Sequence, residues 1–168
     1  MIAVSVTIVV VVLAAAGIAV LVLRARRPRA GYEGKGRILV PFSGALDPTV
    51  LNAAIRIARA EESTLVAAYL LVVPLQYPEE APRRDQVAVA VPLLEAVEHA
   101  ALRAGVPVDA RIEKGRSLTH ALRRLWEVER FERIVAPASG FNAKELAWIL
   151  TNAPAETIVL RPTPVLAA

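Results

Sequence analysis

The distribution of hydrophobic residues divides the chain into an apolar N-terminal run and a longer region of alternating short patterns. Residues 1–23 carry no charge and consist almost entirely of Val, Ile, Leu and Ala. As a helix, this run would be about 34 Å long, enough to cross a hydrocarbon core of roughly 30 Å. Four arginines follow it directly: Arg24, Arg26, Arg27 and Arg29. The pattern predicts a transmembrane helix over residues 1–23.

Two other interpretations of residues 1–23 compete with a membrane span. A cleaved signal peptide carries positive charge before a shorter apolar core, whereas here the arginines follow a longer one. A buried core helix is usually shorter and has a polar stripe. Because basic residues favour the cytoplasmic side, we expect a single-pass protein of the plasma (inner) membrane. Its N-terminus would lie outside and its domain in the cytoplasm.

From residue 37 onward, short apolar runs alternate with segments of helical periodicity. The apolar runs predict strands at 37–42, 64–73, 106–113, 134–138 and 157–160. The segments between them predict helices at 48–60, 85–104, 118–130 and 143–150. This βαβαβαβαβ order predicts an α/β fold with a five-stranded doubly wound parallel sheet. Such sheets bind ligands beyond the carboxyl ends of their strands, where the strand order reverses.

Local signals place several helix boundaries. Asp47 is typical of an N-cap and Pro48 of a first helical residue. Asn142 and Glu145 have the spacing of a capping box. Pro92 should either kink its helix or mark the real start of that helix. The inward face of the first helix of the domain is predicted to be Leu51, Ala54, Ile55 and Ala58.

Charge separates the linker from the domain. Residues 24–37 carry a net charge of +5, so residues 38–168 sum to −1 in a chain of +4. The expected organisation is therefore a transmembrane helix (1–23), a basic juxtamembrane linker (24–36), an α/β domain (37–162) and a disordered tail (163–168). The linker would be attracted to anionic membrane lipids. The near-neutral domain gives no support for nucleic-acid binding.

Few residue types in the domain are suited to metal binding or covalent catalysis. The chain has no cysteine, which excludes disulfides, thiolate metal sites and cysteine nucleophiles. Its two histidines, His99 and His120, lie in predicted helices without a second histidine at ligand spacing, which is typical of ordinary surface or half-buried histidines. No residue stands out as a nucleophile beside a base.

Four segments of the domain together resemble the universal stress protein family. The string RILVPFSG (37–44) is similar to the family's first strand and turn, and RIEKGRSLTHAL (111–122) to its third strand, turn glycine and helix. ERIVAPASG (132–140) resembles the fourth strand entering the nucleotide loop, and NAPAETIVLRP (152–162) the closing helix end and last strand. The resemblance implies a UspA-like, adenine nucleotide hydrolase-like fold. It places a pocket, vestigial in this chain, at Pro41, Ser43, Gly115, Ala136, Ser139 and Gly140.

The chain departs from the family at the nucleotide loop. ATP-binding members carry G-x2-G-x9-G-[ST] after the fourth strand, where backbone N–H groups approach phosphate oxygens. Pro137 occupies the first glycine position and Gly140 the second, while Leu150 and Thr151 would fall inside a helix. Ser43 stands where the family usually has aspartate. We therefore expect the phosphate loop to be absent and no cofactor to bind.

Local roles compete with ligand binding at the surviving positions. Gly140 is typical of a strand-to-helix turn, with residual anion binding at the helix start near Asn142 as the alternative. Ser43 and Ser139 more often satisfy nearby backbone groups than ligands. Gly115 requires no more than a tight turn.

An enzyme hypothesis rests on the string SGALDPT (43–49). It resembles the SGGxDS pyrophosphate loop of ATP pyrophosphatases. Ala45 replaces the second glycine, however, and Pro48 replaces the final serine and removes a donor.

The sequence therefore favours a membrane-anchored, non-catalytic module that regulates or binds proteins. The resemblance suggests a membrane transporter or sensor as partner, and a homodimer formed through the last strand. An ATP-binding stress sensor with a rearranged loop is the alternative, and the pyrophosphatase-like enzyme is the second alternative.

Overall fold

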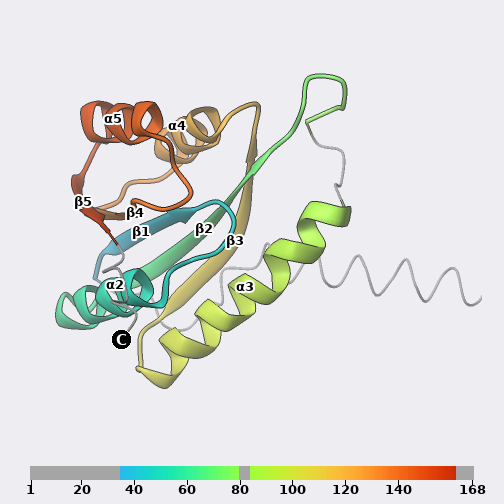
Figure 1. The fold of residues 1–168 in the computed structure, drawn as a ribbon. Helices are drawn as coiled ribbons and strands as arrows, with labels where there is room; N and C mark the ends of the chain where they lie inside the picture. Colours follow the sequence, from blue (N-terminus) through green and yellow to red (C-terminus); the bar gives the residue numbers. More distant parts are fainter. Residues whose placement is uncertain (1–34, 80–83, 162–168) are drawn as a thin grey trace, which may run out of the picture. The chain divides into compact units, whose positions relative to one another are not determined.

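The computed structural model describes residues 35–79 and 84–161 (Figure 1). The expected membrane span, the arginine cluster and the C-terminal tail lie outside these residues. Among the described residues, no helix is both long and apolar enough to cross a bilayer. The strands in this part of the chain are β1 (Arg37–Phe42), β2 (Thr64–Val72), β3 (Val108–Gly115), β4 (Arg133–Pro137) and β5 (Glu156–Leu160). The helices are α2 (Pro48–Ala60), α3 (Arg84–Arg103), α4 (Leu118–Val128) and α5 (Ala143–Asn152).

The strands form one parallel sheet in the order β3-β2-β1-β4-β5. The order reverses between β1 and β4, which is the switch point at which ligands bind in such sheets. Helices α2 and α3 cover one face of the sheet, and α4 and α5 cover the other (Figure 1). The predicted five-stranded doubly wound sheet is confirmed.

Alternate residues of each central strand pack into two separate hydrophobic cores, one on each face of the sheet. On β1, Ile38, Val40 and Phe42 pack with α2 and α3, whereas Leu39 packs with α4 and α5. This alternation follows from the two-residue period of side chains along a strand. Because both faces are covered, β1 and β2 are apolar nearly throughout, as expected for a parallel sheet.

Helix starts follow the local signals. The Asp47 side chain accepts a hydrogen bond of 2.7 Å from the Thr49 backbone N–H, and Pro48 opens α2. The inward face of α2 differs in one residue from its prediction, since Val50 is fully buried and Leu51 only partly. Pro92 does not mark the start of a helix, because α3 begins at Arg84 and continues through it.

Strand β3 begins two residues later than predicted. The N–H of Val106 bonds back to the Ala101 carbonyl, and Gly105 adopts a φ of +70°. These are features of a helix C-terminal cap, so Val106 belongs to the end of α3 rather than to the sheet. The hydrophobicity of Val106 had suggested a strand, but its side chain is buried against the α3 side of the core.

Candidate functional site

The switch point lies between the carboxyl ends of β1 and β4. The ladder between these strands contains the pairs Ile38↔Arg133 and Leu39↔Ile134 and stops before either carboxyl end. Pro41 and Pro137 lie near those ends and have no N–H to donate. Both prolines are buried, as is Ala136. Pro41 and Pro137 therefore add no backbone donor to this edge of the sheet.

The loops after β1 and β4 meet at Gly140 and Ser43. Gly140 has a φ of +89°, and a Cβ built on it would lie 2.7 Å from the Ser43 carbonyl oxygen. Two of the predicted pocket positions are thus brought into direct backbone contact. Ser139, the neighbour of Gly140, is exposed. Gly140 serves as a turn glycine that also permits close packing between the two loops.

Carboxylates occupy the helix starts beside the switch point. At α5, Asn142 Oδ1 accepts from the Glu145 N–H at 2.9 Å, and Glu145 Oε2 accepts from the Asn142 N–H at 2.8 Å. At α2, the Asp47 carboxylate fills the same role. A helix N-terminus attracts anions through its unpaired N–H groups and its dipole. Here the carboxylates of Asp47 and Glu145 accept hydrogen bonds from backbone N–H groups at these helix starts. Their negative charge would repel a phosphate.

The connection from β4 to α5 is only residues 138–142. Phe141 in this loop is 7% exposed and belongs to the core under α4 and α5. Leu150 and Thr151 lie within α5, as predicted, and the Thr151 hydroxyl donates to the Ala147 carbonyl. These residues are on a helix and cannot form a phosphate loop together with Gly140.

Gly115 lies apart from the other predicted pocket positions. It ends β3, which is separated from β1 by β2 in the sheet. A Cβ on Gly115 would lie 2.5 Å from the Ala121 backbone nitrogen. The residue therefore allows α4 to pack closely on the end of β3, a role more specific than the simple turn expected from the sequence.

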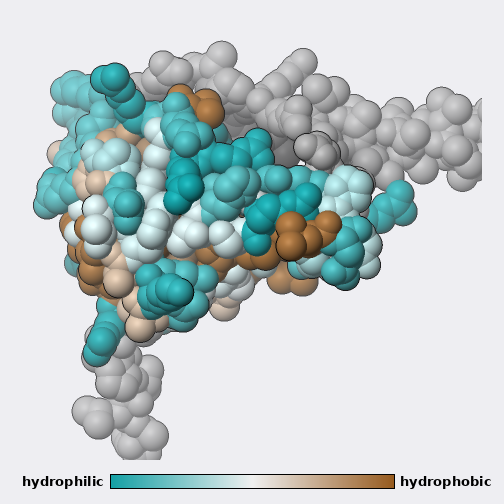
Figure 2. All heavy atoms as spheres, turned by 90° about the horizontal axis from the view of Figure 1, so that it is seen from above, coloured by the Kyte–Doolittle hydropathy of each residue, from teal (hydrophilic) through white to brown (hydrophobic). Residues whose placement is uncertain are grey.

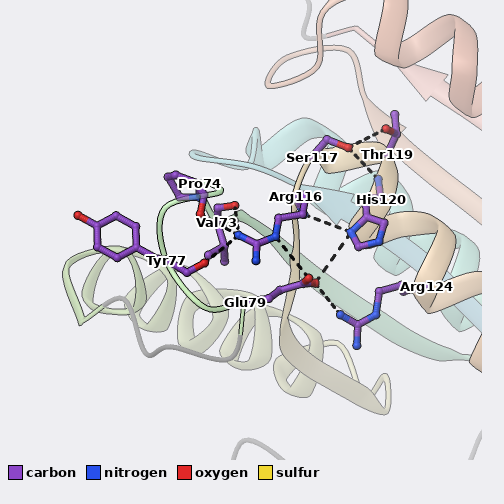
Figure 3. A network of polar contacts seen from close by, with 9 residues as sticks. All are labelled: Val73, Pro74, Tyr77, Glu79, Arg116, Ser117, Thr119, His120 and Arg124. Carbon is purple, nitrogen blue, oxygen red and sulfur yellow. Dashed lines mark hydrogen bonds and ion pairs between the residues drawn. The ribbon is translucent and has the colours of Figure 1, made fainter.

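A polar network joins the ends of β2 and β3 (Figure 3). The Arg116 guanidinium donates through Nη1 to the carbonyls of Val73, Pro74 and Tyr77 at 3.3, 2.8 and 2.9 Å. Its Nε lies 3.6 Å from Glu79 Oε2. No motif in the sequence points to this network. The only available signal was that successive parallel strands end at one edge, which brings Arg116 and the loop after β2 together.

A second charged cluster covers the α4 side of β3. Arg111 Nη1 and Nη2 bind Glu129 Oε1 and Oε2 at 2.5 and 2.7 Å, and Arg111 also pairs with Asp109 at 3.0 Å. Arg37 of β1 reaches Asp109 at 2.8 Å. Burial raises the pKa of the Glu113 carboxyl, whereas the hydrogen bond from Arg111 lowers the pKa of Glu129.

The view from above in Figure 2 shows a surface that is largely hydrophilic, with hydrophobic residues in separate patches. The most exposed large hydrophobic side chain described is Leu75, in the loop after β2. Within the described residues, no group of three or more histidine or acidic side chains has the arrangement of a metal site. His120 is a half-buried histidine, as predicted, and its Nδ1 accepts from the Arg116 N–H.

Solved structures similar to this chain are universal stress proteins. One from Burkholderia pseudomallei has a TM-score of 0.58 and 20% identity, covering 79% of this chain and 98% of that one. The fold is that of the universal stress proteins. Another structure with this fold, from Arabidopsis thaliana with AMP bound, has a TM-score of 0.55 and 14% identity and covers 77% and 93%. A third, from Archaeoglobus fulgidus in complex with dAMP, has a TM-score of 0.58 and 14% identity and covers 74% and 96%.

The likeness is confined to the universal stress fold. No family model matches the sequence, and no curated protein matches it. The fold resemblance drawn from the four sequence segments is therefore confirmed at the level of architecture.

Proposed function

We propose that this chain is a membrane-held, non-catalytic module with the universal stress fold that acts by binding another protein. The main support for the proposal is the presence of acidic side chains beside the switch point between β1 and β4. Asp47 and Glu145 place carboxylates at the two helix starts beside it. A phosphate bound at either helix start would be repelled by the nearby carboxylate. That carboxylate would also compete with the phosphate for backbone N–H donors. Nucleotide chemistry at this edge is accordingly disfavoured.

The proposed anchor is the apolar run of residues 1–23 with the arginines that follow it. Its support is the length of the run and the position of the positive charge. Chain entering from residue 36 reaches the sheet at the amino end of β1, opposite the carboxyl edge that holds the switch point. The proposed orientation puts the domain on the cytoplasmic side, beside a transporter or sensor.

Protease protection tests the proposed anchor. Protease added outside intact cells should leave residues 35–161 uncut, and a chain lacking residues 1–23 should leave the membrane fraction. Digestion of the domain from outside would contradict the orientation. Recovery of the truncated chain in the membrane fraction would contradict the anchor.

We also propose pairing of two copies through β5. The two edge strands differ in charge, and charged side chains discourage pairing at an edge. β3 carries Asp109, Arg111 and Glu113 on one face, whereas β5 is mainly Thr, Ile, Val and Leu. Sedimentation equilibrium should therefore detect a dimer that Ile158→Lys weakens. A purely monomeric wild-type chain would contradict the pairing.

Nucleotide titration tests the central proposal. The full chain in detergent should show no change in thermal midpoint with ATP and Mg²⁺ or with AMP. A ligand present at 100 times its dissociation constant would stabilise the fold by about 2.7 kcal/mol, which a melting curve detects readily. A saturable shift with either nucleotide would overturn the assignment of a non-nucleotide module.

A nucleotide-binding sensor is the second candidate, because structures with the same fold hold AMP, cAMP and dAMP. Binding would then require donors other than a glycine-rich phosphate loop. A saturable thermal shift without nucleotide hydrolysis or pyrophosphate release would favour the sensor. The same shift accompanied by pyrophosphate release would favour the enzyme suggested by Ser43 to Thr49.

A further inference from the structure

Three basic side chains converge on one carboxylate near the start of α4 (Figure 3). Arg124 Nη1 lies 2.7 Å from Glu79 Oε1, and Arg116 Nε lies 3.6 Å from Glu79 Oε2. His120 Nδ1 lies 3.9 Å from Oε1 of the same carboxylate. The Glu79 side chain is only 20% exposed. Two guanidinium groups thus share the Glu79 carboxylate, and Arg124 also interacts electrostatically with the Glu113 carboxylate.

The basic residues are spaced for joint action on one anion. His120 and Arg124 lie four residues apart on α4, a spacing that places side chains on one face of a helix, and Arg116 directly precedes the Ser117 cap. Arg116 and His120 flank the N-terminus of α4, which favours negative charge, whereas Arg124 lies in the second turn of the helix. Its cap is the neutral side chain of Ser117, which accepts from the His120 N–H at 3.1 Å. This helix start therefore differs from those of α2 and α5, which carry carboxylates.

Two of the basic residues are held by contacts that do not involve Glu79. Arg116 is anchored by its Nη1 bonds to three carbonyls of the loop after β2. The His120 ring is oriented by the hydrogen bond from the Arg116 N–H. Arg116 and His120 would therefore keep their positions if the Glu79 carboxylate moved away. Such preorganisation is expected of a binding site rather than of a simple ion pair.

We propose that Arg116 and Arg124, beside His120, form a binding site for a phosphate group, and that the Glu79 carboxylate is its internal occupant. Guanidinium groups bind phosphate oxygens through charge-assisted, often paired hydrogen bonds. An external phosphate would replace the Glu79 carboxylate, while the Nη1 hydrogen bonds of Arg116 keep the loop after β2 in place. The site lies at the ends of β2 and β3, so it is independent of the proposed function at the switch point.

The central test is phosphate binding by the full chain with Glu79→Gln. Inorganic phosphate, measured by calorimetry, should bind this variant about tenfold or more tightly than the wild type, because the competing charged group is gone. The matched control is Glu127→Gln, which removes one negative charge from the exposed side of α4. It should leave phosphate affinity within about twofold of wild type. Equal affinities of the two variants for free phosphate and also for vesicles containing phosphatidate would overturn the proposal.

A double variant distinguishes phosphate binding at this site from a general electrostatic attraction of phosphate to the protein. Arg124→Gln added to Glu79→Gln should abolish the gained affinity for phosphate, with circular dichroism confirming that the double variant is folded.

Binding to vesicles that contain phosphatidate tests whether the phosphate group belongs to a lipid headgroup. Tighter vesicle binding by Glu79→Gln than by Glu127→Gln, without tighter binding of free phosphate, would identify a headgroup as the ligand. No gain in either arm would show that Glu79 only fixes the loop, and the proposal would fail.

Discussion

Gly140 approaches Ser43 so closely that a Cβ at position 140 would lie 2.7 Å from the Ser43 carbonyl oxygen. The contact joins the loop after β4 to the loop after β1 across the switch point of the sheet. Gly140 also has a φ of +89°, a conformation that residues with a Cβ rarely adopt. Close approach and backbone conformation therefore both require glycine here.

Gly140→Ala should lower the free energy of unfolding by about 2–4 kcal/mol, because it adds both backbone strain and a steric conflict. Gly44→Ala is the matched control, since Gly44 has a φ of +78° but nothing within 4 Å of an added Cβ. It should lose only about 1 kcal/mol. Urea denaturation of both variants provides the comparison. Equal losses would mean that the contact with Ser43 has no energetic weight.

Glu113→Gln should raise stability at neutral pH. Burial raises the pKa of the Glu113 carboxyl, so the folded state favours its protonated form. Such a group stabilises the fold below its unfolded pKa and loses that contribution as pH rises through the folded pKa. The neutral amide removes the cost of a buried charge. Unfolding curves should therefore show a gain near pH 7 that shrinks at acidic pH. A gain that is constant with pH would refute this account.

Glu129→Gln should have the opposite pH dependence. The hydrogen bond from Arg111 lowers the pKa of Glu129, so the ionised carboxylate stabilises the fold above its unfolded pKa. The contribution disappears as pH falls through the lowered folded pKa. The variant should lose about 1 kcal/mol or more at neutral pH, with a smaller loss in acid. Stability of Glu129→Gln equal to that of wild type near pH 7 would contradict the role of the Arg111–Glu129 pair.

Trp148→Ala should destabilise the layer formed by α4 and α5. The rings of Trp126 and Trp148 are stacked with centroids 5.3 Å apart, and Arg123 lies 5.7 Å from the Trp148 ring centre. We expect a loss of about 1–3 kcal/mol and a weaker near-ultraviolet circular dichroism signal. Leu150→Ala, on the same helix but 58% exposed, should change stability by less than about 0.5 kcal/mol. Similar losses in both variants would argue against the stack.

Local chemistry accounts for the parts of the fold that the sequence predicted well. The cap at Asp47 and the capping box at Asn142 act within one helical turn, so their signals are complete in a few neighbouring residues. The strands β1 and β2 are apolar nearly throughout, which marks them as buried on both faces. The predicted start of β3 at Val106 is wrong, because a hydrophobic residue can follow the end of a helix as well as begin a strand.

Sites that depend on distant residues could be predicted only in part. Pro137 in place of the first loop glycine is a local fact that the sequence alone shows. The network of Arg116 and Glu79 joins residues 37 positions apart in the chain, through side chains that show no pattern in the sequence.

The sequence by itself determined the alternation of strands and helices and the main helix caps, because periodicity and capping are local properties. Only the tertiary structure decided that Gly140 meets Ser43 and that Glu79 lies among Arg116, His120 and Arg124. Those contacts depend on the strand order β3-β2-β1-β4-β5 and on helix packing. The physical reason is that strand order arises from long-range burial of both sheet faces, which no short segment encodes.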